Sequence, residues 1–512
     1  MFLHALACAV TETLSPLTPL VDPPAVQHAA DCGDLGVVYE IYVRSFQDSD
    51  GDGTGDLDGV ASRLDHLVSL GVDTLWLMPI FPAFGPAGYD VTDFSMITAE
   101  YGDLDDLDDL VDAAHARGLT VLVDLPFNHV DRGHPWFVAA ERGEAGAHRR
   151  FVYADVPADD ARWFASAAGG WFYGYFGRDL PDLDYTDATV LAEMAAIWDR
   201  WLDHVDGFRL DAVITLVEAL GVIEGSAASH EALATLLEEA RAEHPDACFV
   251  AEASEWEAEA GVSWLDTELQ SGVERVLDFV RLDALTTAAR DGDVTELLAV
   301  IEAQSDAGGV SGMATFLGSH DLSRLPTQVP DADARRALRV VQWLLPGSPV
   351  LYYGEELDLA DATSATGQDL AMRAPMPWDS GHAGGFTTGT AWFTLDQGYN
   401  SGANVADQGA DPTSALAFTR ALGCLRKEYA LSEPDAWRPV LGLDPALLMF
   451  RRSSSAGELF VAVNLSARRV DGGSGGPDGL ADLRGNADAI GVLEPWGWRI
   501  FGSAATSCYP DP

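Results

Sequence analysis

Three carboxylates that end or follow short apolar runs could together cleave a glycosidic bond. They belong to Asp211, Glu252 and Asp321. Glycoside hydrolysis needs one carboxylate as a nucleophile and a second, protonated carboxylic acid that serves the leaving oxygen. A retaining enzyme holds these two groups about 5–5.5 Å apart, a separation that neighbouring strands of one sheet can provide.

The residues around two of these acids predict opposite protonation states. Arg209 lies two residues before Asp211, on the same face of a strand. Because a nearby cation favours the ionised form, we expect a lowered pKa for Asp211, as a nucleophile requires. Apolar residues precede Glu252 in CFVAEA, and desolvation there is expected to raise the pKa of Glu252 and keep it protonated. Asp321 remains as a third acid that grips sugar hydroxyls.

Polar side chains at the ends of the other apolar runs are candidates for binding the substrate. Taken singly, each has an ordinary structural explanation, because an Asp after a strand often caps the next helix. Together they favour a functional role, since burying several acids at one rim costs desolvation free energy that a purely structural role does not explain. The predicted substrate-binding residues are Tyr89, Asp90, His129, Arg209 and His320.

The framework that would bring these residues together is visible in the alternation of apolar and amphipathic runs. Eight strands alternating with helices predict an α/β fold, a closed parallel (β/α)8 TIM barrel, whose chemistry lies at the carboxyl ends of the strands. The predicted strands are 37–43, 74–80, 120–126, 207–212, 248–253, 275–279, 314–320 and 349–355.

Two segments break this alternation and predict additional domains. The aromatic- and Gly-rich insert GGWFYGYFGRDLPDLDY is too long for an ordinary loop and indicates a small excursion domain after the third strand. Short apolar runs near the C-terminus indicate an antiparallel β-sandwich. The expected organisation is an N-terminal leader and linker (1–32), a barrel (33–129 and 188–431), the excursion domain (130–187), the C-terminal β-sandwich (432–505) and a tail (506–512).

Composition restricts the partners of the chain. It carries 81 acidic and 30 basic residues in 512, a net charge of −51. Nucleic acid and anionic membranes are therefore repelled at long range. No apolar run reaches the roughly 18 residues of a membrane-spanning helix, so no membrane span is expected. We expect a monomer that acts on a neutral substrate.

The cysteines and the first residues bear on the compartment. The five cysteines form no CxxC pair, which disfavours a zinc site. Cys248 is expected to be a free thiol, and Cys32 and Cys508 could pair in an oxidising compartment. The apolar start MFLHALACAV lacks a basic residue and makes a poor signal peptide, although ALAC resembles a lipoprotein cleavage box at Cys8. We expect a secreted, periplasmic or cell-surface protein.

The acidic stretch DSDGDGTGD, residues 48–56, has the ligands of a cation site. It begins like an EF-hand loop, but the bidentate Glu that an EF-hand needs at position 12 is replaced by Gly59. Hard oxygen ligands in a glycine-rich turn suit Ca²⁺, with Mg²⁺ second. The alternative is an acidic solvated turn. We predict a structural Ca²⁺ that pins the loop after the first strand, with the ligands Asp48, Asp50, Asp52, Thr54 and Asp56.

Several stretches resemble the α-amylase family, glycoside hydrolase family 13, over roughly residues 37–505. DLPFNH, GFRLDAVIT, FVAEASEW and FLGSHD resemble its four signature regions in order, and LPDLDY resembles the fifth. The resemblance implies that Asp211 is the nucleophile, Glu252 the acid/base and Asp321 the transition-state stabiliser. It also implies supporting roles: Arg209 orients the nucleophile, Tyr89 stacks on the sugar, His129 and His320 hydrogen-bond it, and Asp124 is a structural acid beneath.

The resemblance leaves three functions open. The first is a retaining α-amylase that cleaves α-1,4 bonds in starch or maltooligosaccharides, which the short stretch GPAGYD favours because it suits an open groove. The second is an α-glucosidase or a transglycosylase, such as a trehalose synthase or a glucanotransferase, whose metal loops are similar to DSDGDGTGD. The third is a non-catalytic, carbohydrate-binding member. The presence of all three carboxylates argues against it.

Overall fold

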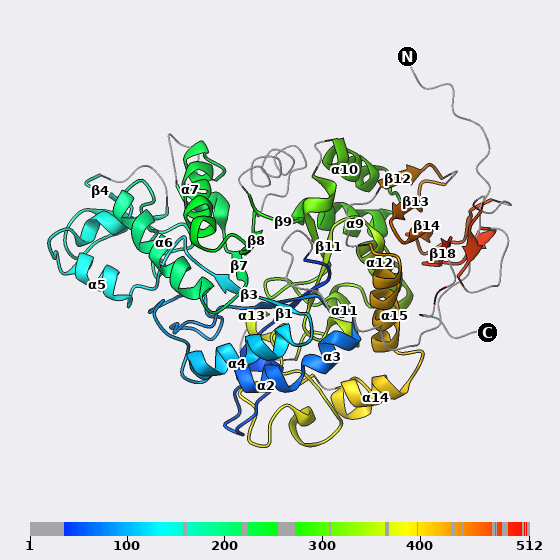
Figure 1. The fold of residues 1–512 in the computed structure, drawn as a ribbon, viewed down its shortest axis with the longest axis horizontal. Coiled ribbons are helices and arrows are strands. Elements are labelled where there is room, and N and C mark those ends of the chain that lie inside the picture. The colour runs from blue at the N-terminus through cyan, green and yellow to red at the C-terminus, as the bar shows by residue number, and fades with distance from the viewer. Residues whose placement is uncertain are drawn as a thin grey trace, which may run out of the picture.

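Eight parallel strands close into a barrel near the centre of the molecule (Figure 1). The computed structural model describes residues 35–503, 506 and 508, apart from 157–160, 218–223, 254–271, 307–308, 364–367, 397, 432–435, 443, 474–476, 478 and 484–489. The barrel strands are β1 (Val38–Ile41), β2 (Thr74–Leu77), β3 (Thr120–Leu125), β7 (Gly207–Leu210), β8 (Cys248–Ala251), β9 (Arg275–Leu277), β10 (Met313–Phe316) and β11 (Ser348–Tyr352). Each overlaps a predicted run, and β1 pairs with β11 to close the ring, so the predicted (β/α)8 barrel is confirmed.

The helices cover the outside of this ring, and helix α4 (Leu104–His115) illustrates why they form. Asp103 caps its first turn in a capping box with Asp106, and Leu107, Leu110 and Ala114 form its buried stripe. The other helices of the described part, of which α5 belongs to the excursion and not to the barrel, are α1 (Val43–Phe46), α2 (Leu57–Ser62), α3 (Leu64–Ser69), α5 (Pro135–Glu141), α6 (Ala188–Leu202), α7 (Ala227–Glu243), α9 (Phe279–Asp291), α10 (Thr295–Asp306), α11 (Leu325–Gln328), α12 (Ala332–Leu344), α13 (Gln368–Ala371), α14 (Val405–Ala410) and α15 (Ala415–Glu428).

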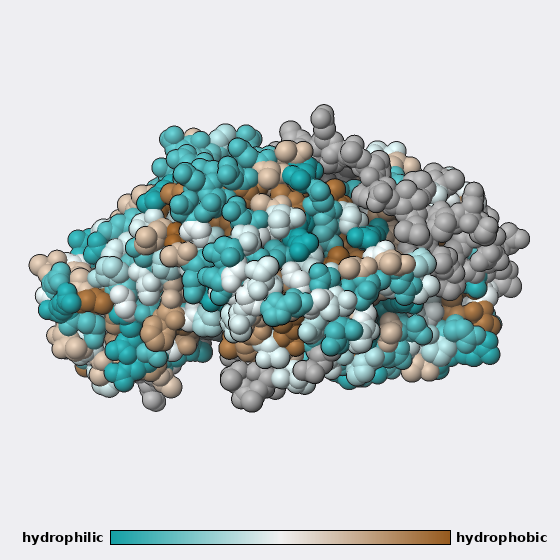
Figure 2. Space-filling model, turned by 90° about the horizontal axis from the view of Figure 1, so that it is seen from below, coloured by the Kyte–Doolittle hydropathy of each residue, from teal (hydrophilic) through white to brown (hydrophobic). Residues whose placement is uncertain are grey.

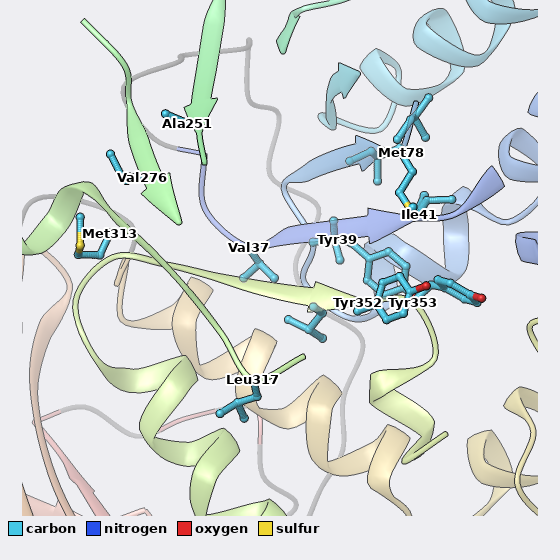
Figure 3. Close-up of a cluster of buried hydrophobic side chains, with 14 of the residues drawn as sticks. Val37, Tyr39, Ile41, Met78, Ala251, Val276, Met313, Leu317, Tyr352 and Tyr353 are labelled. Carbon is cyan, nitrogen blue, oxygen red and sulfur yellow. The ribbon is translucent and has the colours of Figure 1, made fainter. Parts of the chain in front are cut away.

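The barrel strands are buried on both faces, as parallel strands covered by helices must be. Every residue of β1 and β2 is buried. Figure 3 shows this packing where β1 meets β11, with the rings of Tyr39, Tyr352 and Tyr353 grouped beyond Val37. The rings of Tyr352 and Tyr353 lie 4.7 Å apart in an edge-to-face contact. A rigid, packed wall therefore supports the side chains that these strands carry at their carboxyl ends.

An excursion leaves the barrel between β3 and β7, as predicted, and forms the lobe around α5 and β4 in Figure 1. It contains a three-stranded antiparallel sheet with the order β4 (Tyr153–Ala154), β6 (Trp171–Tyr173) and β5 (Trp163–Ala165). Phe137 of α5 packs edge-on against Phe151 and Phe172, with ring centroids 5.0 and 4.9 Å away. This lobe thus has an aromatic core of its own beside the barrel mouth.

The C-terminal part is antiparallel, also as predicted. A five-stranded sheet has the order β12 (Ala436–Val440), β13 (Leu447–Ser454), β14 (Gly457–Asn464), β18 (Trp498–Gly502) and β16 (Ala481–Asp482), and β15 (Val470–Asp471) pairs with β17 (Val492–Leu493). Buried Arg452 joins this sheet to the barrel by donating to the backbone oxygens of Leu345 and Leu431 at 2.9 and 2.7 Å.

The cysteines correct two predictions. Cys508 is disulfide-bonded to Cys424 of α15, with Cα atoms 5.6 Å apart, and so does not pair with Cys32. Cys248 is also disulfide-bonded, not a free thiol, and its partner lies outside the described residues. Burial in an apolar strand hid this bond, because a buried Cys resembles any small hydrophobic residue in sequence.

The surface is hydrophilic over most of the face that Figure 2 presents, with apolar residues scattered between polar ones. The six large apolar side chains that are exposed in the described part include Phe84, Val156 and Leu441. None of the helices in this part combines the length and the apolar character needed to cross a bilayer.

Candidate active site

A single arginine joins three carboxylates at the carboxyl ends of the barrel strands. Arg209 lies in β7, in register with Asp124 of β3, and only 1% of its surface is exposed. Its Nη1 donates to both oxygens of Asp124 and, at 2.7 Å, to Oδ1 of Asp211. Its Nη2 donates to Oε2 of Glu252 at 2.6 Å. The sequence predicted the pair Arg209–Asp211 but not that one cation serves three acids.

The three predicted catalytic acids form one electrostatically coupled group. Asp211 and Glu252 bind adjacent nitrogens of one planar guanidinium, an arrangement that suits the short separation of a retaining pair. Asp321 lies close enough for its charge to affect Asp211. The side chains of Asp211 and Glu252 are 10% and 14% exposed, whereas that of Asp321 is 61% exposed, so Asp321 faces the mouth of the barrel.

The environments of Asp211 and Glu252 differ from those expected. Burial raises the pKa of Asp211 well above its usual range and outweighs Arg209, so the expected lowered pKa is wrong. Glu252 has both polar and apolar neighbours: it binds Arg209, accepts from the backbone N–H of Ala212 at 3.2 Å, and lines a cavity together with Leu277 and Phe316. Ala212 makes this contact from a left-handed conformation, with φ 49° and ψ 41°.

Two aromatic rings stack on each other at the candidate sugar site. Tyr89 stacks on His320, with ring centroids 5.1 Å apart and an interplanar angle of 15°. The Tyr89 hydroxyl lies 2.8 Å from Oδ2 of Asp124, to which it donates, and 2.7 Å from Nε2 of His320. Trp76 of β2 donates to the same Asp124 oxygen at 3.1 Å. Tyr89 and His320 therefore lie together as predicted, and Asp124 lies beneath them.

His320 lies between two carboxylates. Its Nδ1 faces Oε1 of Glu40 in β1, and its Nε2 lies 3.0 Å from Oδ2 of Asp321. Burial lowers the pKa of His320, but Asp321 and Glu40 outweigh burial and raise it to about 10. Burial raises the pKa of Asp321, but His320 outweighs it and holds this pKa well below its usual range.

The two remaining substrate-binding candidates support the loops around the site. His129 is buried, its Nε2 lies 3.0 Å from the backbone oxygen of Tyr89, and burial lowers its pKa to about 4. Asp90 accepts from the backbone N–H of Gly85 at 2.7 Å and so braces the loop that carries Tyr89. Within the part of the chain that the structure describes, neither residue makes a side-chain hydrogen bond to one of the three acids.

Three residues of the site were missed in the sequence. Glu40 lines the same small cavity as Arg209, Glu252, His320 and Asp321. Arg373 lies 3.6 Å from Oδ1 of Asp321 and donates to the backbone oxygen of His320 at 3.0 Å. Phe176 of the excursion is 47% exposed, with its ring 5.1 Å from that of His129. Only Glu40 carried a signal, as a charged residue inside the apolar run VVYEIYV.

The acidic loop brings some of its predicted ligands together. Oxygens of Asp48, Asp50 and Asp56 all lie within 4.8 Å of one another. Each of these three carboxylates also accepts a backbone N–H from within the loop or from the start of α2, which orients it. Asp52 accepts from the backbone N–H of Thr54 at 2.7 Å and is not in this group of three. Such an oxygen-only set fits a hard cation.

Comparison with known proteins agrees with this geometry. The model of the alpha amylase catalytic domain matches residues 40–434. The trehalose synthase/amylase of Mycobacterium tuberculosis is 29% identical over 87% of this chain and 83% of its own length. An oligo-1,6-glucosidase of Heyndrickxia coagulans is 27% identical over 85% of this chain and 92% of its own. The crystal structure of an alpha-amylase from H. orenii superposes with a TM-score of 0.78 at 27% identity, covering 93% of this chain and all of that one. A barrel with three coupled carboxylates at its mouth and a family match across most of the chain agree, and the protein belongs to the α-amylase family, glycoside hydrolase family 13.

Proposed function

We propose that the protein is a retaining α-glucosidase or transglycosylase that acts on α-1,4-linked glucosyl units of short maltooligosaccharides. The observation that carries this proposal is the shared guanidinium of Arg209, which binds Asp211 through Nη1 and Glu252 through Nη2. Two carboxyl groups held this close suit double displacement, because an inverting enzyme needs room for a water molecule between them and the sugar.

In the proposed reaction, the Asp211 carboxylate attacks the anomeric carbon while Glu252 protonates the leaving glycosidic oxygen. The glycosyl–Asp211 ester that forms is then attacked by water or by a sugar hydroxyl, whose proton returns to Glu252. Asp211 must be ionised when it attacks. Arg209 favours that form, although burial raises the pKa of the free carboxyl. Asp321 stays ionised beside His320 and binds hydroxyls of the distorted ring.

Transfer or chain-end action is supported by two relatives, whose names are trehalose synthase/amylase and oligo-1,6-glucosidase. A second candidate, an endo-acting α-amylase on starch, is favoured by the likeness to the H. orenii enzyme.

Incubation with maltose, followed by chromatography and NMR, tests this function. We expect glucose, trehalose or longer oligomers from maltose, with α-configured products first. A maltoheptaose blocked at its non-reducing end should be cleaved slowly or not at all. Rapid cleavage of the blocked chain would support the α-amylase instead. Glu252→Gln is the matched control and should lose turnover while the protein stays folded.

We further propose that the loop 48–56 binds a structural Ca²⁺. The grouping of the Asp48, Asp50 and Asp56 carboxylates supports it, because three anions this close repel one another unless a cation compensates them. The ion would tie the loop after β1 to the rest of the barrel mouth, where Thr387 donates to Asp48.

The Cys424–Cys508 disulfide supports folding in an oxidising compartment.

A further inference from the structure

Glu40 is a buried acid that the proposed reaction does not use. It lies in β1, has no exposed surface, and borders the cavity that Glu252 and Asp321 also line. Its Oε1 binds Nδ1 of His320, and its Oε2 has no hydrogen-bond partner among the described residues. A carboxylate this deep is costly unless it is paired with a cation, and His320 is the group it touches.

Only one protonation state of the His320 ring satisfies all the polar contacts around it. Nδ1 faces the Glu40 carboxylate, so it must carry a proton. Nε2 faces the Asp321 carboxylate at 3.0 Å, so it must carry one as well. The Tyr89 hydroxyl already donates to Asp124, which leaves its oxygen free to accept from Nε2. A neutral ring would place a lone pair against one of the two carboxylates.

We propose that Glu40 is a positioning residue that holds His320 as a cation with both ring nitrogens protonated, and that this cation orients Asp321 and Tyr89 toward the bound sugar. The chain of contacts runs from β1 across the barrel to β3. Glu40 orients the His320 ring, and the ring orients Asp321 and the Tyr89 hydroxyl. Tyr89 in turn donates to Asp124, which binds Arg209. This inference rests on the proposed glycosidase function of the same site.

Charged groups from every neighbouring element act on this ring. The acids are Glu40 from β1, Asp124 from β3 and Asp321 beside it. The nearby cations are Arg209 of β7, which lines the same cavity as His320, and Arg373, which donates to the backbone oxygen of His320. Trp76 itself meets the His320 ring edge-on at 6.0 Å. The raised pKa of His320 agrees with the dominance of the acids.

The test combines catalysis with direct titration of the ring. Glu40→Gln keeps the shape and an acceptor for Nδ1 but removes the charge. We expect kcat/KM on maltose to fall about 100-fold, mostly in kcat, as for a misplaced reacting group. In the His320→Gln background, Glu40→Gln should add little, because residues that act through one another are not additive. In protein labelled with ¹⁵N-histidine, the pKa of His320 should fall by about 1–3 units in Glu40→Gln. The NMR signal that is missing from His320→Gln is assigned to His320.

Glu356→Gln is the matched control. Glu356 is equally buried, and its Oε1 accepts from His66 Nε2 at 2.9 Å in a second Glu–His pair away from the three acids. It should lower the melting temperature without moving the His320 titration. An unchanged His320 titration in Glu40→Gln, or an equal loss of kcat/KM in both backgrounds, overturns the inference. If the wild type cleaves no α-glucoside but Glu40→Gln still shifts His320, the proposed function fails while the pairing stands.

Discussion

The Arg209 guanidinium is bound to Asp124 through a single nitrogen that lies 2.8 and 2.9 Å from the two carboxylate oxygens, and both side chains are buried. This contact fixes the direction of the guanidinium. One hydrogen on Nη1 and one on Nη2 then point at Asp211 and Glu252, respectively. Asp124, which resembles only a structural acid in sequence, thereby sets the spacing of the two groups that would carry out the chemistry.

Arg209→Met should destabilise the protein as well as inactivate it. The change leaves the buried Asp124 and Asp211 and the partly buried Glu252 without their cation, and breaking a buried ion pair from one side costs about 3–5 kcal/mol. The midpoint of urea unfolding measures this cost. Arg469→Met is the control, because Arg469 pairs with Glu494 on the surface and exposed pairs contribute at most about 1 kcal/mol. Equal shifts in both variants would contradict the central role of Arg209.

Calcium should raise the melting temperature of the wild type by several degrees. A ligand present at 100 times its Kd stabilises a protein by about 2.7 kcal/mol. Asp50→Ala should abolish this response, because Asp50 contributes one of the three grouped carboxylates. Asp109→Ala removes one exposed charge from α4 and should leave the calcium response intact. Calorimetry of chelator-treated protein with and without Ca²⁺ decides the matter; a response that survives in Asp50→Ala points to general charge screening.

Acid should destabilise the protein partly through His134, the N-cap residue of α5. Burial lowers its pKa to about 4, whereas the unfolded chain binds this proton below about 6.5. The contribution of neutral His134 to the free energy of unfolding is therefore fully present above about pH 6.5. It is lost as the pH falls toward 4, by at most about 1.4 kcal/mol per pH unit. In the wild type, the backbone N–H of Trp136 donates to Nδ1 of His134 at 3.2 Å, and His134→Asn keeps an acceptor for this N–H. Unfolding free energies from pH 4 to 7 should show a shallower slope, and an unchanged slope counts against this role.

Removing the Cys424–Cys508 disulfide should cost about 2–5 kcal/mol, because the bond closes a long loop. The two cysteines are 84 residues apart in sequence. The double variant Cys424→Ser/Cys508→Ser is preferable to a reductant, since a reductant would also open the bond of Cys248. Thermal unfolding measures the loss. An unchanged midpoint would mean that Arg452 and the packing of β14 suffice to hold the C-terminal sheet.

The barrel could be predicted from sequence because its strands are short, β-branched and separated by amphipathic helices. Strand ends also identified Asp211 and Asp321, since residues after parallel strands gather at one rim. Glu40 escaped this reasoning because it lies inside β1, not after it. Inward and outward residues alternate along a strand, so only the closed ring reveals that Glu40 faces His320.

Protonation states and long-range bonds were harder to predict from the sequence than the barrel. The pKa of Asp211 depends on the balance between burial and a cation that it shares with two other acids, and residue spacing reports neither. The pairing of Cys424 with Cys508 likewise depends on where the chain after β18 returns to α15. Both are properties of contacts between segments distant in sequence.

Ala212 restricts how this catalytic centre could be altered by evolution or by engineering. Its left-handed backbone points an N–H at Glu252, and a side chain branched at Cβ would raise the energy of that conformation. Libraries that aim to broaden what the enzyme accepts should therefore spare this position and vary the excursion around Phe176, where an exposed ring can be exchanged without bending the main chain.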